Sequence, residues 1–253
     1  MPIAAENALK VLGLLDLTSL EASDTEAKIA DLCRRAVTPF GKVAAVCVYP
    51  RFAKQCRAAL KGSGVRVAAV VNFPDGGADA PAAGRECRGA VAEGAQEIDM
   101  VLPFEEFRRG KPEAARKVVA ACREACGKSV LLKVILETGV LAEPGLIAEA
   151  SRLAIAEGAD FIKTSTGKRQ PAATPDAARV MLEAIRGARR PVGFKAAGGV
   201  RSVEQAQAYV ALAEEIMGAG WCTPSTFRIG ASGLLDDVLR HLGGAGRDGG
   251  SAY

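Results

Sequence analysis

159-ADFIKTSTGKRQPAATPDAARVMLEAIRGARRPVGFKAAGG-199 holds two short apolar runs with a helical stretch between them. The runs at 159–165 and 191–199 are nearly continuous rather than alternating, which is typical of strands covered on both faces of a parallel sheet. Residues 175–188 carry apolar side chains at helical spacing. The order strand, helix, strand therefore predicts one βα unit followed by the next parallel strand.

The same alternation recurs along the chain. Strands are expected at 12–18, 43–50, 66–74, 96–104, 130–137, 159–165, 191–199 and 226–232, and further helices at 25–37, 112–127, 143–158 and 202–219. Eight strands, each followed by a helix, within about 250 residues predict a single-domain α/β fold, the (β/α)8 TIM barrel. A doubly wound sheet is the alternative, but no G-x-G-x-x-G follows the first strand.

No linker divides the chain into separate domains. We expect one barrel domain over residues 1–242. The remaining residues, 243-GGAGRDGGSAY-253, are rich in glycine and are expected to form a flexible tail.

The overall composition narrows the classes of function. The net charge of +4 is mild and evenly spread, and aromatic residues make up only 5% of the chain, so no nucleic-acid partner is expected. A small anionic substrate would account for a local basic cluster. The N-terminal residues lack the apolar region of a signal peptide, and no apolar span approaches transmembrane length. We therefore expect a cytoplasmic protein with no membrane partner.

Histidine and cysteine usage restricts the chemistry further. The seven cysteines are scattered without a C-x-x-C pair, so neither a disulfide framework nor a zinc ribbon is predicted. His241 is the only histidine, which argues against Ser-His-Asp triads and multi-histidine metal sites. We expect no metal, and lysines become the main candidates for acid–base and nucleophilic work.

Polar residues occur where the apolar strands are expected to end. In chain order they are Asp16, Cys47, Asn72, Asp99, Lys133, Lys163, Lys195 and the turn at 230–232. In a (β/α)8 barrel the carboxyl ends of all strands meet at one mouth, where the active site lies. Three lysines and two aspartates at such positions are hard to explain by packing alone.

Two of these lysines are expected to act together. A lysine attacks a carbonyl only as the neutral amine, and burial or a neighbouring cation favours that form. Lys163 and Lys195 end adjacent strands, so one can stay charged and keep the other neutral. Asp99, two strands earlier, is a candidate for proton transfer. The set predicts a Schiff-base enzyme, and structural ion pairs lining a barrel mouth are the alternative.

Glycine-containing turns follow the last three expected strands. They read 166-TGK-168, 198-GGVR-201 and 230-GASG-233. Glycine lets backbone N–H groups approach an anion closely, and barrels often bind phosphate at the loops after the last two strands. With Lys168 and Arg201 as countercharges and the hydroxyl of Ser232, the turns favour a phosphorylated substrate.

The motifs of nearly the whole chain resemble the class I deoxyribose-phosphate aldolase family. They are 15-LDLTSL-20, 47-CVYPRF-52, 71-VNFPDG-76, 97-EIDMVLPF-104, 132-LKVILETG-139, 160-DFIKTSTGK-168, 193-GFKAAGGVR-201 and 228-RIGASGLL-235. The resemblance implies a (β/α)8 barrel that reversibly cleaves 2-deoxy-D-ribose 5-phosphate into acetaldehyde and D-glyceraldehyde 3-phosphate, without a metal or organic cofactor. It also implies a possible homodimer.

The resemblance implies roles for individual residues. Lys163 matches the Schiff-base lysine, Lys195 the second lysine that favours its neutral form, and Asp99 the carboxylate that moves protons with a water molecule. Asp16 and Lys133 match the supporting polar network of the pocket. Cys47 matches the aldehyde-sensitive cysteine, and Tyr253 matches the tyrosine that ends a mobile tail. Those that match the phosphate site are Gly167, Lys168, Gly198, Gly199, Val200, Arg201, Gly230, Ser232 and Gly233.

The sequence departs from the family pattern in places outside the proposed catalytic groups. Alanine follows Lys195 where proline is common, and Asp75 stands where histidine is frequent. Gly233 stands where a second serine is common, which removes one hydroxyl from the phosphate site.

Two other functions stay open. These are a lysine-dependent aldolase for another phosphosugar, which only a substrate panel separates, and a non-catalytic phosphosugar-binding barrel. A metal-dependent aldolase would need several histidines.

Overall fold

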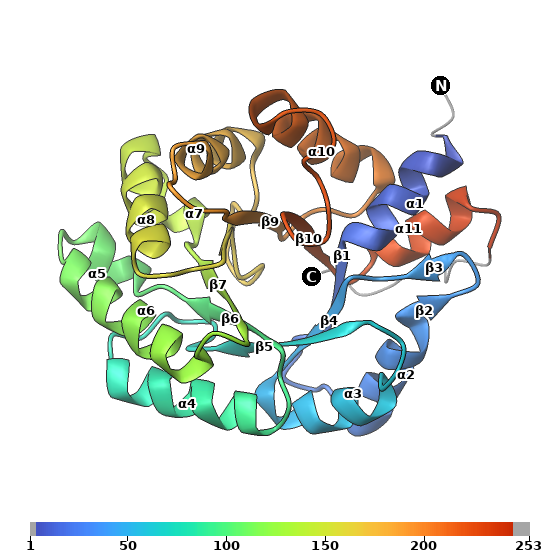
Figure 1. Cartoon of the computed structure of the whole chain (residues 1–253), viewed down its shortest axis with the longest axis horizontal. Helices are drawn as coiled ribbons and strands as arrows, with labels where there is room; N and C mark the ends of the chain where they lie inside the picture. Colours follow the sequence, from blue (N-terminus) through green and yellow to red (C-terminus); the bar gives the residue numbers. More distant parts are fainter. Residues whose placement is uncertain (1–3, 245–253) are drawn as a thin grey trace.

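Eight parallel strands close into a barrel in the computed structural model, which describes residues 4–244 (Figure 1). The strands are β1 (Leu15–Thr18), β4 (Ala45–Val48), β5 (Arg66–Val71), β6 (Glu97–Val101), β7 (Leu131–Ile135), β8 (Phe161–Lys163), β9 (Gly193–Ala197) and β10 (Phe227–Ala231). Their order around the ring is β1-β10-β9-β8-β7-β6-β5-β4, with β1 pairing β4 to close it. The predicted (β/α)8 barrel is confirmed.

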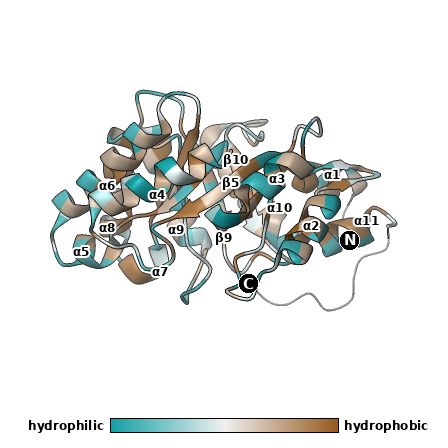
Figure 2. Ribbon diagram, turned by 90° about the horizontal axis from the view of Figure 1, so that it is seen from below, coloured by the Kyte–Doolittle hydropathy of each residue, from teal (hydrophilic) through white to brown (hydrophobic). Residues whose placement is uncertain are grey.

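Helices surround the strands on the outside (Figure 1). They are α1 (Ala5–Leu14), α2 (Glu26–Arg35), the 3-10 helix η1 (Pro50–Phe52), α3 (Ala53–Ala59), α4 (Ala80–Ala92), α5 (Phe104–Arg108), α6 (Pro112–Cys126), α7 (Thr138–Leu141), α8 (Pro144–Ala156), α9 (Pro175–Arg186), α10 (Val203–Met217) and α11 (Leu234–His241). Seen from the side, hydrophobic colouring follows the strands and hydrophilic colouring the helix surfaces (Figure 2). The core therefore lies between the barrel wall and the inner helix faces.

Helix starts follow local capping chemistry. The side chains of Thr25, Asp79, Thr174 and Ser202 each accept a hydrogen bond from a backbone N–H in the first turn of the helix that follows. Such caps satisfy donors that the helix itself leaves unpaired. Four helices also carry proline in the first turn, where its missing N–H costs nothing.

The first expected strand was placed three residues too early. Residues 12–14 form the last turn of α1, and β1 begins at Leu15. The run 12-LGLL-15 is apolar in either state, and Ala8, Val11 and Leu12 are buried at helical spacing. The short hairpin of β2 (Val37–Thr38) and β3 (Gly41–Lys42) was also not expected.

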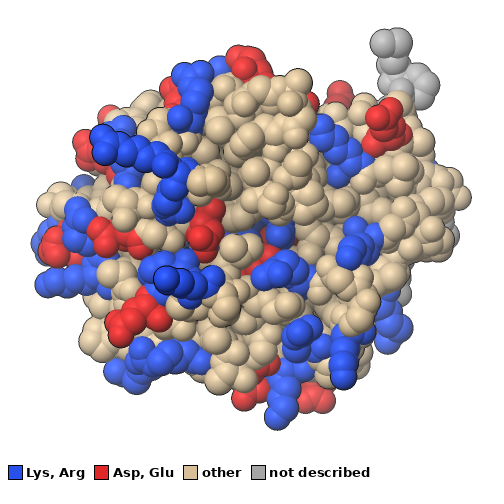
Figure 3. Space-filling view, in the orientation of Figure 1, with Lys and Arg blue, Asp and Glu red and all other residues tan. Residues whose placement is uncertain are grey.

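On the face in Figure 3 basic and acidic side chains are interspersed, with several basic ones near its centre. Among residues 4–244 no helix is long and apolar enough to cross a bilayer. The proposed tail, 243–253, lies almost entirely outside the described residues, so the division into barrel and tail stays a prediction.

Candidate active site

Lys163 lies at the carboxyl end of β8 inside the barrel mouth. It is the last residue of the strand, its side chain is only 3% exposed, and it lies beside Lys195 of β9 in the strand register. Its Nζ donates to Oδ2 of Asp99 at 2.9 Å. The expected proximity of the two lysines and Asp99 is therefore present in the structure.

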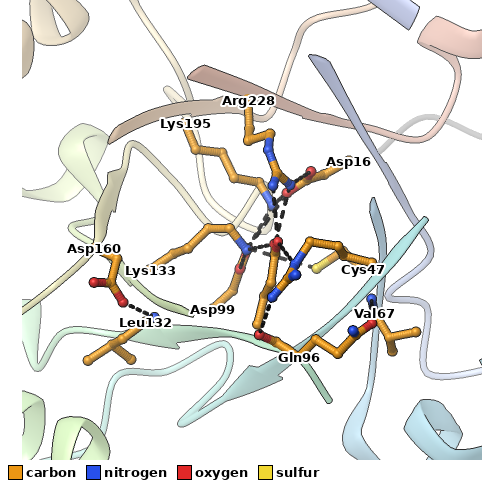
Figure 4. A network of polar contacts seen from close by, with 12 residues as sticks. Asp16, Cys47, Val67, Gln96, Asp99, Leu132, Lys133, Asp160, Lys195 and Arg228 are labelled. Carbon is orange, nitrogen blue, oxygen red and sulfur yellow. Dashed lines mark hydrogen bonds and ion pairs between the residues drawn. The ribbon is translucent and has the colours of Figure 1, made fainter. Parts of the chain in front are cut away.

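Asp99 on β6 is the centre of the cluster (Figure 4). Besides Lys163, its carboxylate accepts from Lys195 at 2.8 Å and from Lys133 at 2.8 Å. The Asp99 side chain is fully buried. One carboxylate thus holds three lysines from three different strands within hydrogen-bonding distance.

Two further carboxylates and two arginines extend the network around Asp99. One of the arginines, Arg66, is 38% exposed and lies 2.8 Å from Glu97. Asp16 accepts from Lys195 at 2.5 Å and from Arg228 at 2.7 Å. Glu97 lies 2.5 Å from Lys133 and 3.0 Å from Arg228. Lys133, Lys195 and Asp99 lie within their strands rather than at the ends, so the polar residues fill the barrel interior as well as its mouth.

The buried cluster has one cation more than it has carboxylates. Its cations are Lys133, Lys163, Lys195 and Arg228, and its carboxylates are Asp16, Glu97 and Asp99. Lys195 and Lys133 each contact at least two carboxylates, whereas among residues 4–244 the one carboxylate that Lys163 contacts is Asp99. Lys163 therefore has the fewest anionic partners of the three lysines. Because excess charge is costly to bury, the buried members of the cluster would be balanced with one lysine uncharged.

The other two lysines of the cluster have raised pKa values. Burial alone would lower the pKa of Lys195, but the carboxylates of Asp16 and Asp99 outweigh it and raise that pKa above its usual range. Lys133 also has a raised pKa, since Asp99 and Glu97 overcome its burial. These two lysines therefore stay protonated at neutral pH.

The three carboxyls of the cluster have lowered pKa values. Burial opposes their ionisation, but the adjacent lysines, joined by Arg228 at Asp16 and Glu97, outweigh it. A carboxyl whose pKa is lower in the folded state binds protons more readily once unfolded, so stability rises with pH in that range. The stabilisation is complete above about pH 4, the unfolded pKa range. It is lost as the pH falls toward the folded values.

We predict that the melting temperature falls steeply below about pH 4. The slope of the unfolding free energy against pH near pH 3 gives the number of protons taken up on unfolding. This number should be smaller in Glu97→Gln than in the unchanged protein, because one titrating carboxyl is removed. Equal slopes for the two proteins would contradict a lowered pKa at Glu97.

Cys47 on β4 also faces the cluster. Its Sγ lies 3.9 Å from Oδ2 of Asp99 and the residue is fully buried. Burial, and then the negative charge of Asp99, raise the pKa of the Cys47 thiol to about 11. The thiolate is the reactive form, so Cys47 is a weak nucleophile at neutral pH.

We predict that iodoacetamide modifies Cys47 about tenfold faster for each pH unit between pH 7 and 9. No plateau should appear in that range, because the thiolate fraction keeps growing until the pH nears the thiol pKa. Peptide mapping by mass spectrometry measures the rate at this position. A rate that levels off below pH 9 would show a thiol far more acidic than the structure indicates.

The glycine turns after β8 and β9 lie against each other. A Cβ on Gly198 would come within 3.2 Å of the Gly167 backbone, and Gly198 adopts a φ of 86°. Gly199 is exposed next to it, Val200 is buried, and Arg201 is exposed. The two turns thus bring their backbones together at one side of the mouth, with basic side chains nearby.

The turn after β10 has two different parts. Gly230 lies within the strand, where a Cβ would come 3.0 Å from Cε of Lys195, so this glycine makes room for the lysine. Ser232 and Gly233 are partly exposed and lead into α11, with Gly233 at the cap position. Lys168 extends from the β8 loop, and its Nζ lies 3.3 Å from Oε1 of Glu21.

Sequence reasoning missed Glu97 and Arg228. The prediction was based on polar residues where strands were expected to end. Glu97 lies two positions before Asp99, and Arg228 lies two positions before Gly230. Residues two apart on a strand point to the same side, so each shares the interior face with its neighbour. Charged residues at that spacing inside an apolar strand were the available signal.

Glu137 was also missed. It lies two residues after the end of β7, is fully buried and has a φ of 56°, a conformation that is uncommon for residues other than glycine. Its carboxylate accepts from the Thr166 backbone N–H at 3.2 Å and from the Thr166 hydroxyl at 2.5 Å. Thr166 in turn accepts from the Lys168 N–H, so Glu137 holds the loop that carries Gly167 and Lys168. Burial raises the pKa of Glu137.

Comparison with known proteins agrees with this barrel. The sequence pattern of the DeoC/LacD family aldolases matches residues 10–238, and the chain belongs to this family. Aldolases are lyases that make and break carbon–carbon bonds, so the protein is an enzyme of that class.

Particular relatives are similar over nearly their full lengths. The chain is 53% identical over 240 residues to the deoxyribose-phosphate aldolase of Agrobacterium fabrum, covering 94% of this chain and 93% of that protein. The solved structure of the aldolase QR15 is 28% identical with a TM-score of 0.77, covering 92% and 97% of the two chains. The tetrameric deoxyribose phosphate aldolase of Aeropyrum pernix shares the fold at 23% identity, with a TM-score of 0.75 and coverage of 94% and 96%.

Proposed function

We propose that this protein is a class I aldolase that reversibly cleaves 2-deoxy-D-ribose 5-phosphate into acetaldehyde and D-glyceraldehyde 3-phosphate. This reaction serves the degradation of deoxyribonucleotides. The observation that carries the proposal is the position of Lys163 at the mouth, with one carboxylate partner in a cluster that holds one excess cation. The 53% identity to the Agrobacterium fabrum enzyme supports the choice of substrate.

The proposed reaction begins at the aldehyde carbon C1 of the open-chain sugar. The neutral amine of Lys163 adds to C1. Loss of water and uptake of one proton from an acid then leave a protonated imine. A base takes the proton of the C3 hydroxyl, the C2–C3 bond breaks, and its electron pair moves toward the imine nitrogen to form an enamine. Glyceraldehyde 3-phosphate leaves. Protonation of C2 and addition of water then release acetaldehyde and restore the amine.

The neighbouring groups have distinct proposed roles. Lys195 stays protonated between Asp16 and Asp99, and its charge favours the neutral form of Lys163. Asp99 contacts the Lys163 amine directly and is placed to exchange protons with it, alone or through a water molecule. Lys133 balances the charge of Asp99, and Cys47 lines the same wall.

The phosphate end of the substrate is proposed to bind over the turns after β8, β9 and β10. The adjoining backbones of Gly167 and Gly198 support this placement, since such turns present N–H groups to an anion. The other proposed contacts are Lys168, Gly199, Val200, Arg201, Gly230, Ser232 and Gly233. Because Gly230 packs against Lys195, its contribution is space for that lysine rather than a direct contact.

The test is turnover of 2-deoxyribose 5-phosphate with and without borohydride. Borohydride reduces the imine, so substrate and borohydride together should inactivate the enzyme, and peptide mapping should place the adduct on Lys163. Turnover of a panel of other phosphosugars distinguishes a 2-deoxyribose 5-phosphate aldolase from an aldolase that acts on a different phosphosugar. No adduct at any lysine, together with no turnover, would overturn the proposal.

Three further expectations belong to the same proposal. Tyr253 is proposed to assist proton exchange at C2, although it lies outside the described residues. A homodimer is proposed from the family resemblance, and sedimentation velocity would test it. Action in the cytoplasm is proposed because the substrate is an intracellular type of metabolite, and cell fractionation would test it.

A further inference from the structure

An ion pair crosses the mouth above the proposed phosphate site. Lys168 lies in the loop after β8 and Glu21 in the loop after β1, and their side chains approach to 3.3 Å. Strands β9 and β10 separate β8 from β1 around the ring. The pair therefore spans the sector of the mouth in which the turns at 198–201 and 230–233 lie.

Glu21 is presented from a firmly held loop. Its backbone N–H donates to Oδ2 of Asp24 at 3.0 Å, and its carbonyl accepts from the Asp24 N–H at 3.0 Å. Asp24 is buried, accepts from the Ser19 hydroxyl and pairs with Lys28. The backbone of Glu21 is thus held near the mouth, so its carboxylate cannot move farther away than its own side chain allows when it releases its cation.

The cation next to Lys168 points elsewhere. Arg169 lies 3.5 Å from Asp75 and stacks over the ring of Phe104 at 5.1 Å. Asp75 and Glu21 are therefore two carboxylates that pair with consecutive cations of one loop. Only Glu21 does so across the sector of the glycine turns, so Asp75 provides a matched comparison.

We propose that Glu21 is a specificity-determining residue that competes with the substrate phosphate for Lys168. This inference rests on the proposed function, in which Lys168 binds the phosphate. Exposed ion pairs are weak, so a phosphate dianion can displace Glu21. The displaced carboxylate stays close and repels the bound phosphate. Glu21 thereby weakens the binding of phosphorylated substrate without touching the chemistry at Lys163.

The first test compares Glu21→Gln with Asp75→Asn, which remove the same charge from the two sides of the β8 loop. Glu21→Gln should lower the KM for 2-deoxyribose 5-phosphate about two- to fivefold, the size of an exposed ion pair. The kcat, and the KM for unphosphorylated 2-deoxyribose, should not change. Asp75→Asn should leave all of these values unchanged. A KM that stays constant in Glu21→Gln, or falls equally in both variants, would overturn the proposal.

The second test asks whether Glu21 acts through Lys168. Lys168→Met should raise the KM for the phosphorylated substrate, and adding Glu21→Gln to it should recover much less than the two- to fivefold gained in the unchanged background. If Glu21→Gln lowers the KM by the same factor in both backgrounds, competition for Lys168 is refuted.

The third test separates this inference from the proposed substrate. Binding of inorganic phosphate is measured by calorimetry, which requires no turnover. Glu21→Gln should bind phosphate about two- to fivefold more tightly than the unchanged protein, and Asp75→Asn should not. If Glu21→Gln binds phosphate more tightly but the enzyme does not cleave 2-deoxyribose 5-phosphate, the role of Glu21 in phosphate binding is supported and the proposed substrate is rejected. Cleavage with unchanged phosphate binding would reject the role of Glu21.

Discussion

Lys163→Met is expected to lower kcat/KM for 2-deoxyribose 5-phosphate by roughly 10⁴-fold or more, because the variant has no amine at the position of covalent attack. Borohydride trapping should disappear with it. The free energy of unfolding should change by less than about 1 kcal/mol, since three buried cations (Lys133, Lys195 and Arg228) remain for the three carboxylates of the cluster.

Lys195→Met is the control for this result. It also removes one cation, but it strips a partner from both Asp16 and Asp99. We therefore expect it to destabilise the fold more than Lys163→Met does, while Lys163 remains available for some borohydride trapping. Thermal unfolding and mass spectrometry measure the two effects. Undiminished trapping in Lys163→Met would place the Schiff base on another lysine.

Asp99→Asn is expected to have the largest effect on stability. The change leaves Lys133, Lys163 and Lys195 without the carboxylate they share, and all three side chains are almost fully buried. Removing one partner of a buried ion pair typically costs about 3–5 kcal/mol. Chemical denaturation should show a loss of this size in the free energy of unfolding.

Two further variants serve as comparisons for Asp99→Asn. Glu105→Gln removes a carboxylate from an exposed pair with Arg108 and should cost less than about 0.5 kcal/mol. Adding Lys133→Met to Asp99→Asn restores the original excess of one cation, so the double variant should be more stable than Asp99→Asn alone. If Asp99→Asn costs no more than the Glu105 variant, the network does not hold the barrel interior together.

Much of the fold follows from local patterns in the chain. The near-continuous apolar runs predicted all eight strands, with boundaries that differ from the structure by a few residues. Thr174 and Ser202 mark the starts of helices whose apolar spacing was already visible. The start of β1 was misplaced because an apolar run such as 12-LGLL-15 fits a buried helix end as well as a strand.

The candidate site was predictable in part. Lys163, Lys195 and Asp99 interrupt apolar strands at regular spacing, and the repeat of βα units brings such positions to one mouth. Glu97, Arg228, Glu137 and Glu21 were not predicted. Their roles depend on contacts between strands or loops far apart in the chain, which no local pattern reveals.

The sequence by itself determined the barrel, the positions of the lysines in its strands and the glycine turns, because each follows from residue types at a fixed spacing along one chain. Only the tertiary structure decided which lysine has a single carboxylate partner and which cation Glu21 holds. Charge balance and ion pairing depend on distances across the barrel. Those distances exist only once all eight strands have closed around Asp99.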